Sequence, residues 1–237
     1  MSKLQLSMLC AMAAGAMMPL GAYLATVERI RPQWLENELR HSIIAFGGGV
    51  LLAAVAFVLV PQGVNYLPPF WAVAAFGAGG LVFFWIDMMI ARRGHSAAQM
   101  IAMVSDFIPE AMALGVIFIS DMHTGFLLSA LIGLQNLPEG FNAYRELMAT
   151  NGHSARRVLI SFSALSLLGP AAAMIGYYYL KDLPALTGAV MLSAAGGILY
   201  LTFQDIAVQA HLKRRWAPSL GAVGGFMLGL IGHLLVH

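Results

Sequence analysis

Residues 42–60 read SIIAFGGGVLLAAVAFVLV, a run of 19 residues without one charged side chain. A helix needs about 20 apolar residues to cross the hydrocarbon core of a bilayer, so this run predicts a membrane-spanning helix. Lipid-exposed backbone must satisfy its own hydrogen bonds, which favours helices over open strands. The stretch therefore predicts an all-α membrane protein.

The rest of the chain has the same composition. Of its 237 residues, 59% are hydrophobic and 10% are charged, whereas about 25% of the residues in a soluble domain are charged. The net charge is only +2, and the basic residues are scattered at predicted helix ends, which argues against nucleic acid as a partner. Cys10 is the only cysteine, so the chain can form neither an internal disulfide nor a cluster of thiolate ligands.

Apolar runs bounded by charges or turn residues predict eight spanning helices in one transmembrane domain that covers residues 1–237. Their expected ranges are 4–27, 41–62, 69–91, 97–120, 125–148, 157–180, 185–211 and 217–236. The first 25 residues could instead be a cleaved secretory signal, because they also begin with a basic residue followed by an apolar run. The length of the run from Leu4 to Val27 favours a spanning helix.

Basic residues fall on alternate loops of this arrangement. Eleven of the thirteen Lys and Arg residues flank the loops after the first, third, fifth and seventh helices: Arg29, Arg31, Arg40, Arg92, Arg93, Arg145, Arg156, Arg157, Lys213, Arg214 and Arg215. The positive-inside rule makes these loops cytoplasmic, so both termini are expected outside the cytoplasm. The expected location is the plasma membrane, a bacterial inner membrane, with the lipid bilayer as the main partner. The oligomeric state is left open, with a homodimer as one option.

Small residues gather in three of the predicted helices. Gly47–Gly49 with Ala53 and Ala54 lie in the second helix, Ser193–Gly197 in the seventh, and four glycines from Gly221 to Gly229 in the eighth. Small side chains let helix backbones approach closely in membranes. These clusters therefore predict tight helix packing.

A short motif occurs in both the fourth and the fifth predicted helix. It reads Asp106-Phe-Ile-Pro-Glu110 in one and Gln135-Asn-Leu-Pro-Glu139 in the other. Residues four apart share a helix face, so each copy presents two oxygen donors together. The helices run in opposite directions, and counting from their outer ends places Asp106 level with Glu139, and Glu110 level with Gln135, near the midplane. The four side chains are predicted to converge.

Each copy also contains a proline. Pro109 and Pro138 remove a backbone donor, which frees the carbonyls of Ser105 and Leu134 and predicts a break or kink beside the carboxylates. Paired broken helices with polar groups at the midplane are typical of transporter binding sites. Carboxylates are costly there, so a divalent cation that neutralises them is the predicted ligand. The alternative is a set of protonated groups bonded to one another, as a packing device or a proton relay.

Polar residues continue from both motifs toward the cytoplasmic side. Asn142 and Glu146 continue the polar face of the fifth helix, while His95 and Gln99 precede Asp106 in the fourth. These residues predict a pathway to the cytoplasm, although a helix end that becomes polar on leaving the bilayer would look similar.

Three more residues near the inner helix ends are candidates for a transient exit site: Asp205, His211 and His41. Polar residues are common where helices end at a membrane interface, so each of the three could also be an ordinary helix-end residue. Asp87 is expected to pair with Arg92 or Arg93.

The hexapeptide Gln135-Asn136-Leu137-Pro138-Glu139-Gly140 resembles the fifth-helix motif of the ZIP (Zrt/Irt-like protein) metal transporters at every defined position. The fourth-helix copy keeps Pro109 and Glu110, but it has Asp106 where the family usually has His, and Phe107 where the family has Asn. Two further segments resemble family sequences more faintly. Pro61-Gln62 in the second predicted helix resembles a family Pro-Glu, and Gln204-Asp205-Ile206 in the seventh resembles Asp-Glu-Leu. The resemblance implies eight helices, a metal site on helices four and five that sometimes holds two ions, and an elevator-like motion of that bundle.

The departures from the family pattern bear on the number of metal ions. A second ion in the family uses the Asn of helix four and an acidic residue of helix six. This chain has Phe107 in helix four, and the small polar groups of its helix six are only serines, Ser161, Ser163 and Ser166. We therefore predict one principal metal ion. Its predicted ligands are Asp106, Glu110, Gln135 and Glu139, and Asn136 is a secondary ligand. Oxygen donors alone would also admit Mn²⁺, Fe²⁺ or Cd²⁺. The resemblance implies Zn²⁺, and we predict zinc with low selectivity.

These inferences predict a carrier that moves a divalent metal toward the cytoplasm, not an enzyme, and one without an organic cofactor. The sequence contains no G-x-x-x-x-G-K-[ST] motif for nucleotide binding, so the metal gradient or coupled protons would drive transport. Two alternatives remain. One is an intramembrane metal-dependent hydrolase, although no histidine lies in either motif. The other is a membrane protein that binds metal without transporting it.

Overall fold

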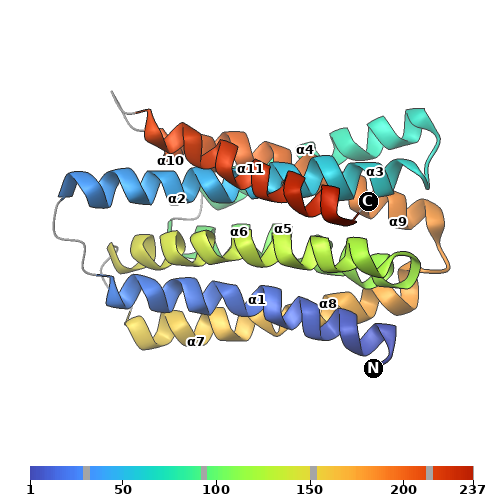
Figure 1. Ribbon diagram of the computed structural model, residues 1–237, viewed down its shortest axis with the longest axis horizontal. Helices are drawn as coiled ribbons and strands as arrows, with labels where there is room; N and C mark the ends of the chain where they lie inside the picture. The colour runs from blue at the N-terminus through green and yellow to red at the C-terminus, as the bar shows by residue number, and fades with distance from the viewer. Residues whose placement is uncertain (29–32, 92–94, 150–153, 212–215, 237) are drawn as a thin grey trace.

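The computed structural model describes residues 1–28, 33–91, 95–149, 154–211 and 216–236 (Figure 1). Several residues of the sequence-based predictions lie outside these ranges: Arg29, Arg31, Arg92, Arg93, Lys213, Arg214 and Arg215. The side chains of His95 and Gln99 are also outside what is described. Within the described ranges the chain is helical and contains no strand, which confirms the all-α prediction.

The α-helices and three π-helical segments follow one another along the chain. The α-helices are α1 (Lys3–Val27), α2 (Gln33–Ala54), α3 (Val60–Val64), α4 (Pro69–Ala91), α5 (His95–Ser120), α6 (Met122–Ala149), α7 (Ala155–Ser166), α8 (Leu168–Ile175), α9 (Pro184–Leu201), α10 (Ala207–Ala210) and α11 (Ala217–Val236). The π-helical segment η1 (Val55–Leu59) joins α2 to α3, η2 (Gly176–Leu180) follows α8, and η3 (Thr202–Ile206) joins α9 to α10.

Seven helical stretches in the described ranges are long and apolar enough to cross a membrane. They are Lys3–Val27, Asn37–Val64, Pro69–Met89, Met103–Ser120, Ala155–Leu180, Pro184–Ala210 and Ala217–Val236. These stretches coincide with seven of the eight predicted spans and support an integral membrane protein. The remaining prediction falls on α6, which has 28 residues but is less apolar because it carries Gln135, Asn136 and Glu139. That α6 also crosses the membrane stays a prediction.

Both prolines of the repeated motif lie inside uninterrupted α-helix. The helices α5 and α6 continue through Pro109 and Pro138, so the predicted breaks are wrong as interruptions of the helix. A proline removes one backbone donor, and in packed membrane helices the neighbouring elements tolerate that loss. The irregular turns lie elsewhere, in η1, η2 and η3. One of them, η3, carries Asp205.

The helices form two groups that lie one above the other in Figure 1. The first group contains α1, α5, α6, α7 and α8, and the second contains α2, α3, α4, α9, α10 and α11. The groups meet where α6 packs on α2 and where α5 packs on α9. More than half of the residues of α6 are buried. Because α6 contacts both groups, its polar residues are shielded from lipid.

Four helix pairs cross at reciprocal glycines. A Cβ atom on either glycine would lie 2.2 Å or less from a carbonyl oxygen of the partner helix, and that carbonyl belongs to the residue three positions before the partner glycine. The pairs are Gly21 with Gly140 (α1 and α6), Gly49 with Gly225 (α2 and α11), Gly79 with Gly196 (α4 and α9), and Gly115 with Gly176 (α5 and η2). The absence of a side chain lets the backbones touch, as predicted for the second, seventh and eighth helices.

Both termini lie at the same end of the molecule (Figure 1). At that end α1 begins with a capping box, in which Gln5 N–H donates to Ser2 Oγ (3.2 Å) and Ser2 N–H donates to Gln5 Oε1 (3.0 Å). The Lys3 ammonium donates to the carbonyl of Ile119, at the last turn of α5 (2.6 Å). The shared end agrees with the predicted alternation of loops, while the side of the membrane on which it lies stays a prediction.

Candidate functional site

The two copies of the motif meet through Glu110 and Gln135. The side-chain nitrogen of Gln135 donates to both carboxylate oxygens of Glu110, at 3.0 Å to Oε1 and 2.8 Å to Oε2. Both side chains are 0% exposed. The prediction that these residues lie level with each other on α5 and α6 is therefore confirmed.

Three buried oxygens on α6 have no hydrogen-bond partner among the described residues: Gln135 Oε1, Asn136 Oδ1 and Glu139 Oε2. The nitrogen of Asn136 donates to the carbonyl of Ala14 at 3.0 Å, which fixes this side chain against α1. All three unpaired atoms are acceptors, so each would accept a proton or a cation but not another carbonyl. Buried polar atoms are seldom left unpaired in native proteins, and those that are require an explanation.

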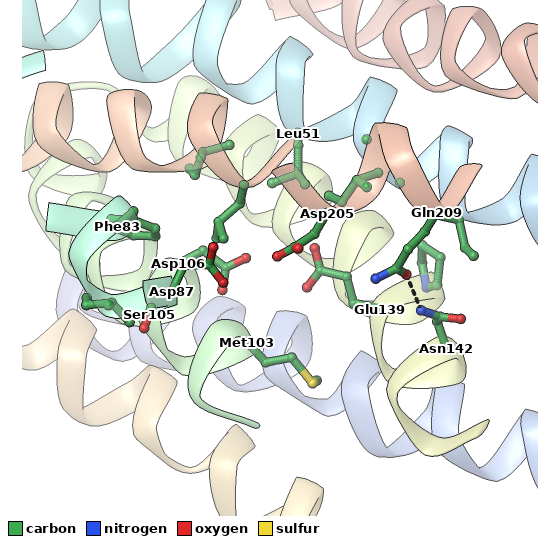
Figure 2. Close-up of a pocket in the computed structure, with 18 residues that line it drawn as sticks. Leu51, Phe83, Asp87, Met103, Ser105, Asp106, Glu139, Asn142, Asp205 and Gln209 are labelled. Carbon is green, nitrogen blue, oxygen red and sulfur yellow. Dashed lines mark hydrogen bonds between the residues drawn. The ribbon is translucent and has the colours of Figure 1, made fainter. Parts of the chain in front are cut away.

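The other two motif residues, Asp106 and Glu139, line a cavity of about 170 Å³ between the two helix groups. Asp106 is 5% exposed, and its Oδ1 accepts the backbone N–H of Phe107 at 2.8 Å. Figure 2 shows both carboxylates directed into this space. Ser105 also lines the cavity, and its hydroxyl donates to the carbonyl of Ile101 (2.7 Å).

Two further carboxylates reach the same cavity from the second helix group. Asp87 comes from α4 and Asp205 from η3. The hydroxyl of Tyr200 donates to Asp87 Oδ2 at 2.9 Å. In Figure 2 the carboxylate of Asp205 faces that of Glu139. The cavity therefore carries four carboxylates, and none of the described residues that line it is basic.

Amide side chains lie one helical turn beyond Glu139 and Asp205. Asn142 on α6 and Gln209 on α10 both line the cavity, and Asn142 Nδ2 donates to Gln209 Oε1 at 2.8 Å (Figure 2). The same nitrogen donates to Glu146 Oε1 at 3.0 Å. Arg40 on α2 donates to Asn142 Oδ1 from Nη2 at 2.9 Å and from Nε at 3.3 Å. The predicted pathway residues Asn142 and Glu146 are thus in direct contact.

The predicted exit site is brought together only in part. Asp205 lines the cavity, but His41 and His211 do not. The Nδ1 of His41 lies 2.5 Å from the carbonyl oxygen of Asn37 in its own helix, and His211 follows the last turn of α10. His41 is thus engaged by the backbone of α2, and His211 is exposed.

In the described parts of the chain, no three side chains of the types His, Cys, Asp and Glu are grouped closely enough to hold a metal ion. The hydrogen bonds explain this spacing. Glu110 is turned toward Gln135, Asp106 toward the Phe107 backbone, and Asp87 toward Tyr200. Two of the predicted ligands, Glu110 and Asp106, are therefore held by protein partners and not collected with Glu139 around one point.

Phe107 separates the motif from α1 and α8. The ring is 1% exposed, and its tip would lie 2.8 Å from a Cβ atom on Gly15 and 2.6 Å from one on Gly169. The two glycines make the space in which this ring fits. An apolar, close-packed side chain therefore occupies the place where the family resemblance would put an Asn ligand.

The turn between α5 and α6 contains a helix cap. Asp121 accepts the backbone N–H groups of His123 (3.0 Å) and Thr124 (3.3 Å), and its other oxygen accepts the Thr124 hydroxyl. The hydrogen bond from that hydroxyl is the main reason why the pKa of Asp121 lies below its usual value. Asp121 is therefore the N-terminal cap of α6.

Three residues of the cavity and its end escaped the sequence analysis. Asp87 accepts the Tyr200 hydroxyl, while its predicted partners Arg92 and Arg93 lie outside the described residues. Gln209 belongs to no motif, and Arg40 is one of many basic residues near the predicted helix ends. Arg40 and Asn142 are 102 positions apart in the chain, so no periodicity links them. The nearest signal in the sequence is Asp205, which lies five residues before the end of the apolar stretch Pro184–Ala210.

The sequence matches no protein-family model and no curated protein.

Proposed function

We propose that this protein is a carrier for divalent metal cations, with zinc as its main cargo, and that the metal binds where α5 and α6 meet. The observation that carries the proposal is the group of buried acceptor oxygens around Glu110, Gln135 and Glu139, three of which have no hydrogen-bond partner among the described residues. A cation would satisfy acceptors of this kind, whereas a further hydrogen-bond acceptor would not. The similarity of both motifs to those of ZIP transporters supports the same assignment.

The charge of the adjoining cavity supports a cationic cargo. Four carboxylates line it, from Asp87, Asp106, Glu139 and Asp205, and none of its described lining residues is basic. An acidic side chain at the centre of a membrane helix costs about 2.5 to 3.5 kcal/mol on insertion scales. A divalent ion would offset that cost for two carboxylates at once.

Binding would require Glu110 to exchange partners. Both of its oxygens accept hydrogen bonds from Gln135 Nε2, so a metal at Glu110 competes with that amide. Rotation of the Gln135 amide would turn its unpaired Oε1 toward the ion and remove the competing donor in one movement. Asp106 and Glu139 can approach from the cavity side. The principal site thus comprises Asp106, Glu110, Gln135 and Glu139, with Asn136 as a secondary ligand.

The donor set bears on selectivity. All of these ligands offer oxygen, and oxygen donors alone bind Mn²⁺ and Fe²⁺ as well as Zn²⁺. We therefore propose zinc transport with weak discrimination. The clustering of basic residues on alternate loops supports an orientation in which those loops face the cytoplasm, and we propose that the metal moves toward that side.

Metal uptake into proteoliposomes tests the proposal directly. Purified protein is reconstituted with a zinc-sensitive dye inside the vesicles, and uptake is compared for the parent, Glu110→Ala and Glu139→Ala. Loss of uptake in both variants is expected, because each removes a carboxylate from the site. The matched control is Asp182→Ala, which removes an exposed carboxylate two residues after η2 and should leave uptake unchanged.

Equal uptake by the parent and both glutamate variants would refute the carrier. Zinc binding in competition titrations without any uptake would instead select the metal-binding protein that does not transport. Metal-dependent cleavage of a lipid or peptide without flux would select the hydrolase. A metal-dependent hydrolase usually has histidine ligands, and none of the described residues that line the cavity is a histidine.

A further inference from the structure

The amide of Asn142 joins three helices at the end of the acidic cavity. Its oxygen accepts two N–H groups of Arg40 from α2, and its nitrogen donates to Gln209 on α10 and to Glu146 on α6 itself. A primary amide has two donor hydrogens and two acceptor lone pairs, so all four positions of Asn142 are in use. Its side chain is only 7% exposed.

The position of this amide relative to the carboxylates is fixed by the helices. Asn142 lies three residues after Glu139 on α6, and Gln209 lies four residues after Asp205 on η3 and α10. The bond between Asn142 and Gln209 therefore spans from α6 to α10 next to the pair formed by Glu139 and Asp205 (Figure 2). A cation that leaves the cavity along α6 meets this bridge first, and the Arg40 guanidinium directly behind it.

The charge of Arg40 distinguishes this bridge from ordinary packing. Hydrogen bonds with a charged partner are stronger than those between neutral groups, so the guanidinium holds Asn142 in the orientation that reaches Gln209. The same positive charge repels a cation at short range, next to a cavity whose charged lining groups are all carboxylates. Opening the bridge requires Arg40 to release Asn142. This release would remove both the hydrogen-bonded bridge and the positive charge from the path of the cation.

We propose that Arg40, Asn142 and Gln209 form a charged gate that closes the cavity at the end where α2 begins and α10 ends, with Arg40 as the residue that positions the amide. The gate is inferred from hydrogen bonds and cavity lining alone. Only the nature of the cargo, a divalent cation, rests on the proposed function.

Thiol labelling tests the gate without reference to transport. Because Cys10 is the only cysteine of the chain, Cys10→Ser gives a background without thiols, and Leu51→Cys places one reporter on the cavity wall, where Leu51 is 1% exposed. The probe is a membrane-impermeant, cationic methanethiosulfonate, added to inverted membrane vesicles and separately to intact spheroplasts. Each preparation exposes one face of the protein, so the two together report on both ends of the cavity.

Arg40→Ala and Gln209→Leu are the test variants. Each removes one side of the bridge and is expected to speed labelling about tenfold or more, the effect of losing a charge-assisted or buried hydrogen bond. The increase should occur only from the face that carries Arg40. The matched control is Arg156→Ala, an exposed arginine in the first turn of α7, which should label at the parent rate.

Three results would overturn the gate. They are an unchanged rate in both test variants, an equal increase in Arg156→Ala, and an increase from both faces, which would indicate general loosening of the helices. Gln209→Leu keeps every charge, so it still decides the question if Arg40→Ala fails to fold. Failure of zinc uptake in the parent would refute the carrier while leaving the labelling result intact.

Discussion

Gln135 donates from one nitrogen to both carboxylate oxygens of Glu110 in a contact that is completely buried. The contact links α5 to α6 at the two motif copies and leaves the oxygen of the same amide without a partner among the described residues. One side chain thus stabilises the closed arrangement and also holds an unused acceptor. Its substitution should affect stability and metal binding in separable ways.

Replacing Gln135 by Leu should destabilise the protein. Glu110 would lose both of its hydrogen bonds and remain buried, at a cost of about 1 to 3 kcal/mol in the free energy of unfolding. Denaturation in mixed detergent micelles, followed by circular dichroism, measures the loss. Gln204→Leu is the matched control, because Gln204 is exposed on η3 and its loss should change the free energy of unfolding little. Equal stability of Gln135→Leu and the parent would show that the buried contact contributes nothing.

Added metal should raise the melting temperature of the purified protein. A ligand at 100 times its dissociation constant stabilises a folded state by about 2.7 kcal/mol, and a shift of several degrees is expected with Zn²⁺ and also with Mn²⁺. Glu139→Gln should abolish the shift, since it replaces a carboxylate by a neutral amide of the same size. Asp182→Asn should retain it. A shift that survives in Glu139→Gln would place the metal elsewhere.

The cap at Asp121 predicts a defined dependence on pH. The hydrogen bond from Thr124 lowers the pKa of Asp121 in the folded state, so its stabilising contribution is complete above the unfolded pKa, near 3.9, and disappears as the pH falls through the lower folded value. Asp121→Ala should cost about 1 kcal/mol at pH 7, the usual value of an N-terminal cap.

The measurement is the difference in melting temperature between the parent and Asp121→Ala from pH 7 down to pH 2.5. The difference should stay constant to about pH 4, the region of the unfolded pKa, and shrink below it. A difference that instead grew on acidification would contradict the capping role of this carboxylate.

The crossing of α1 and α6 should tolerate no side chain at Gly140. An added Cβ atom would lie 2.2 Å from the carbonyl oxygen of Met18, and forcing extra atoms into a packed interface costs about 1 to 3 kcal/mol. Gly140→Ala should therefore lower the detergent concentration at which the helices unfold. Gly77→Ala is the control, because a Cβ atom there would meet nothing within 4 Å. Ala favours a helix more than Gly does, so a similar loss in both variants would contradict the crossing as its cause.

The sequence was sufficient to predict the features that depend on local composition. The apolar runs predicted seven helices that the structure contains, because lipid selects residue type directly. The spacing of Glu110 and Gln135 on antiparallel helices predicted their pairing. The proline of each motif was misleading, because α5 and α6 continue through Pro109 and Pro138.

Features that depend on contacts between distant segments could not be predicted in this way. Asp87 contacts Tyr200, and Arg40 contacts Asn142, and both contacts cross between helices far apart in the chain. A charged residue near a helix end is common at any membrane interface, so Asp87 and Arg40 carried no signal of their own. The cavity that makes them relevant exists only once the two helix groups have packed.

The reciprocal glycine crossings have a consequence for how this chain is made. Every helix of the four crossings touches a partner separated from it by several other helices, and α2 must wait for α11 while α3 to α10 are synthesised between them. Folding that depends on contacts between distant segments is slow and leaves aggregation-prone intermediates. The nascent protein therefore has to sit in the bilayer with its glycine surfaces open to lipid and to other membrane proteins.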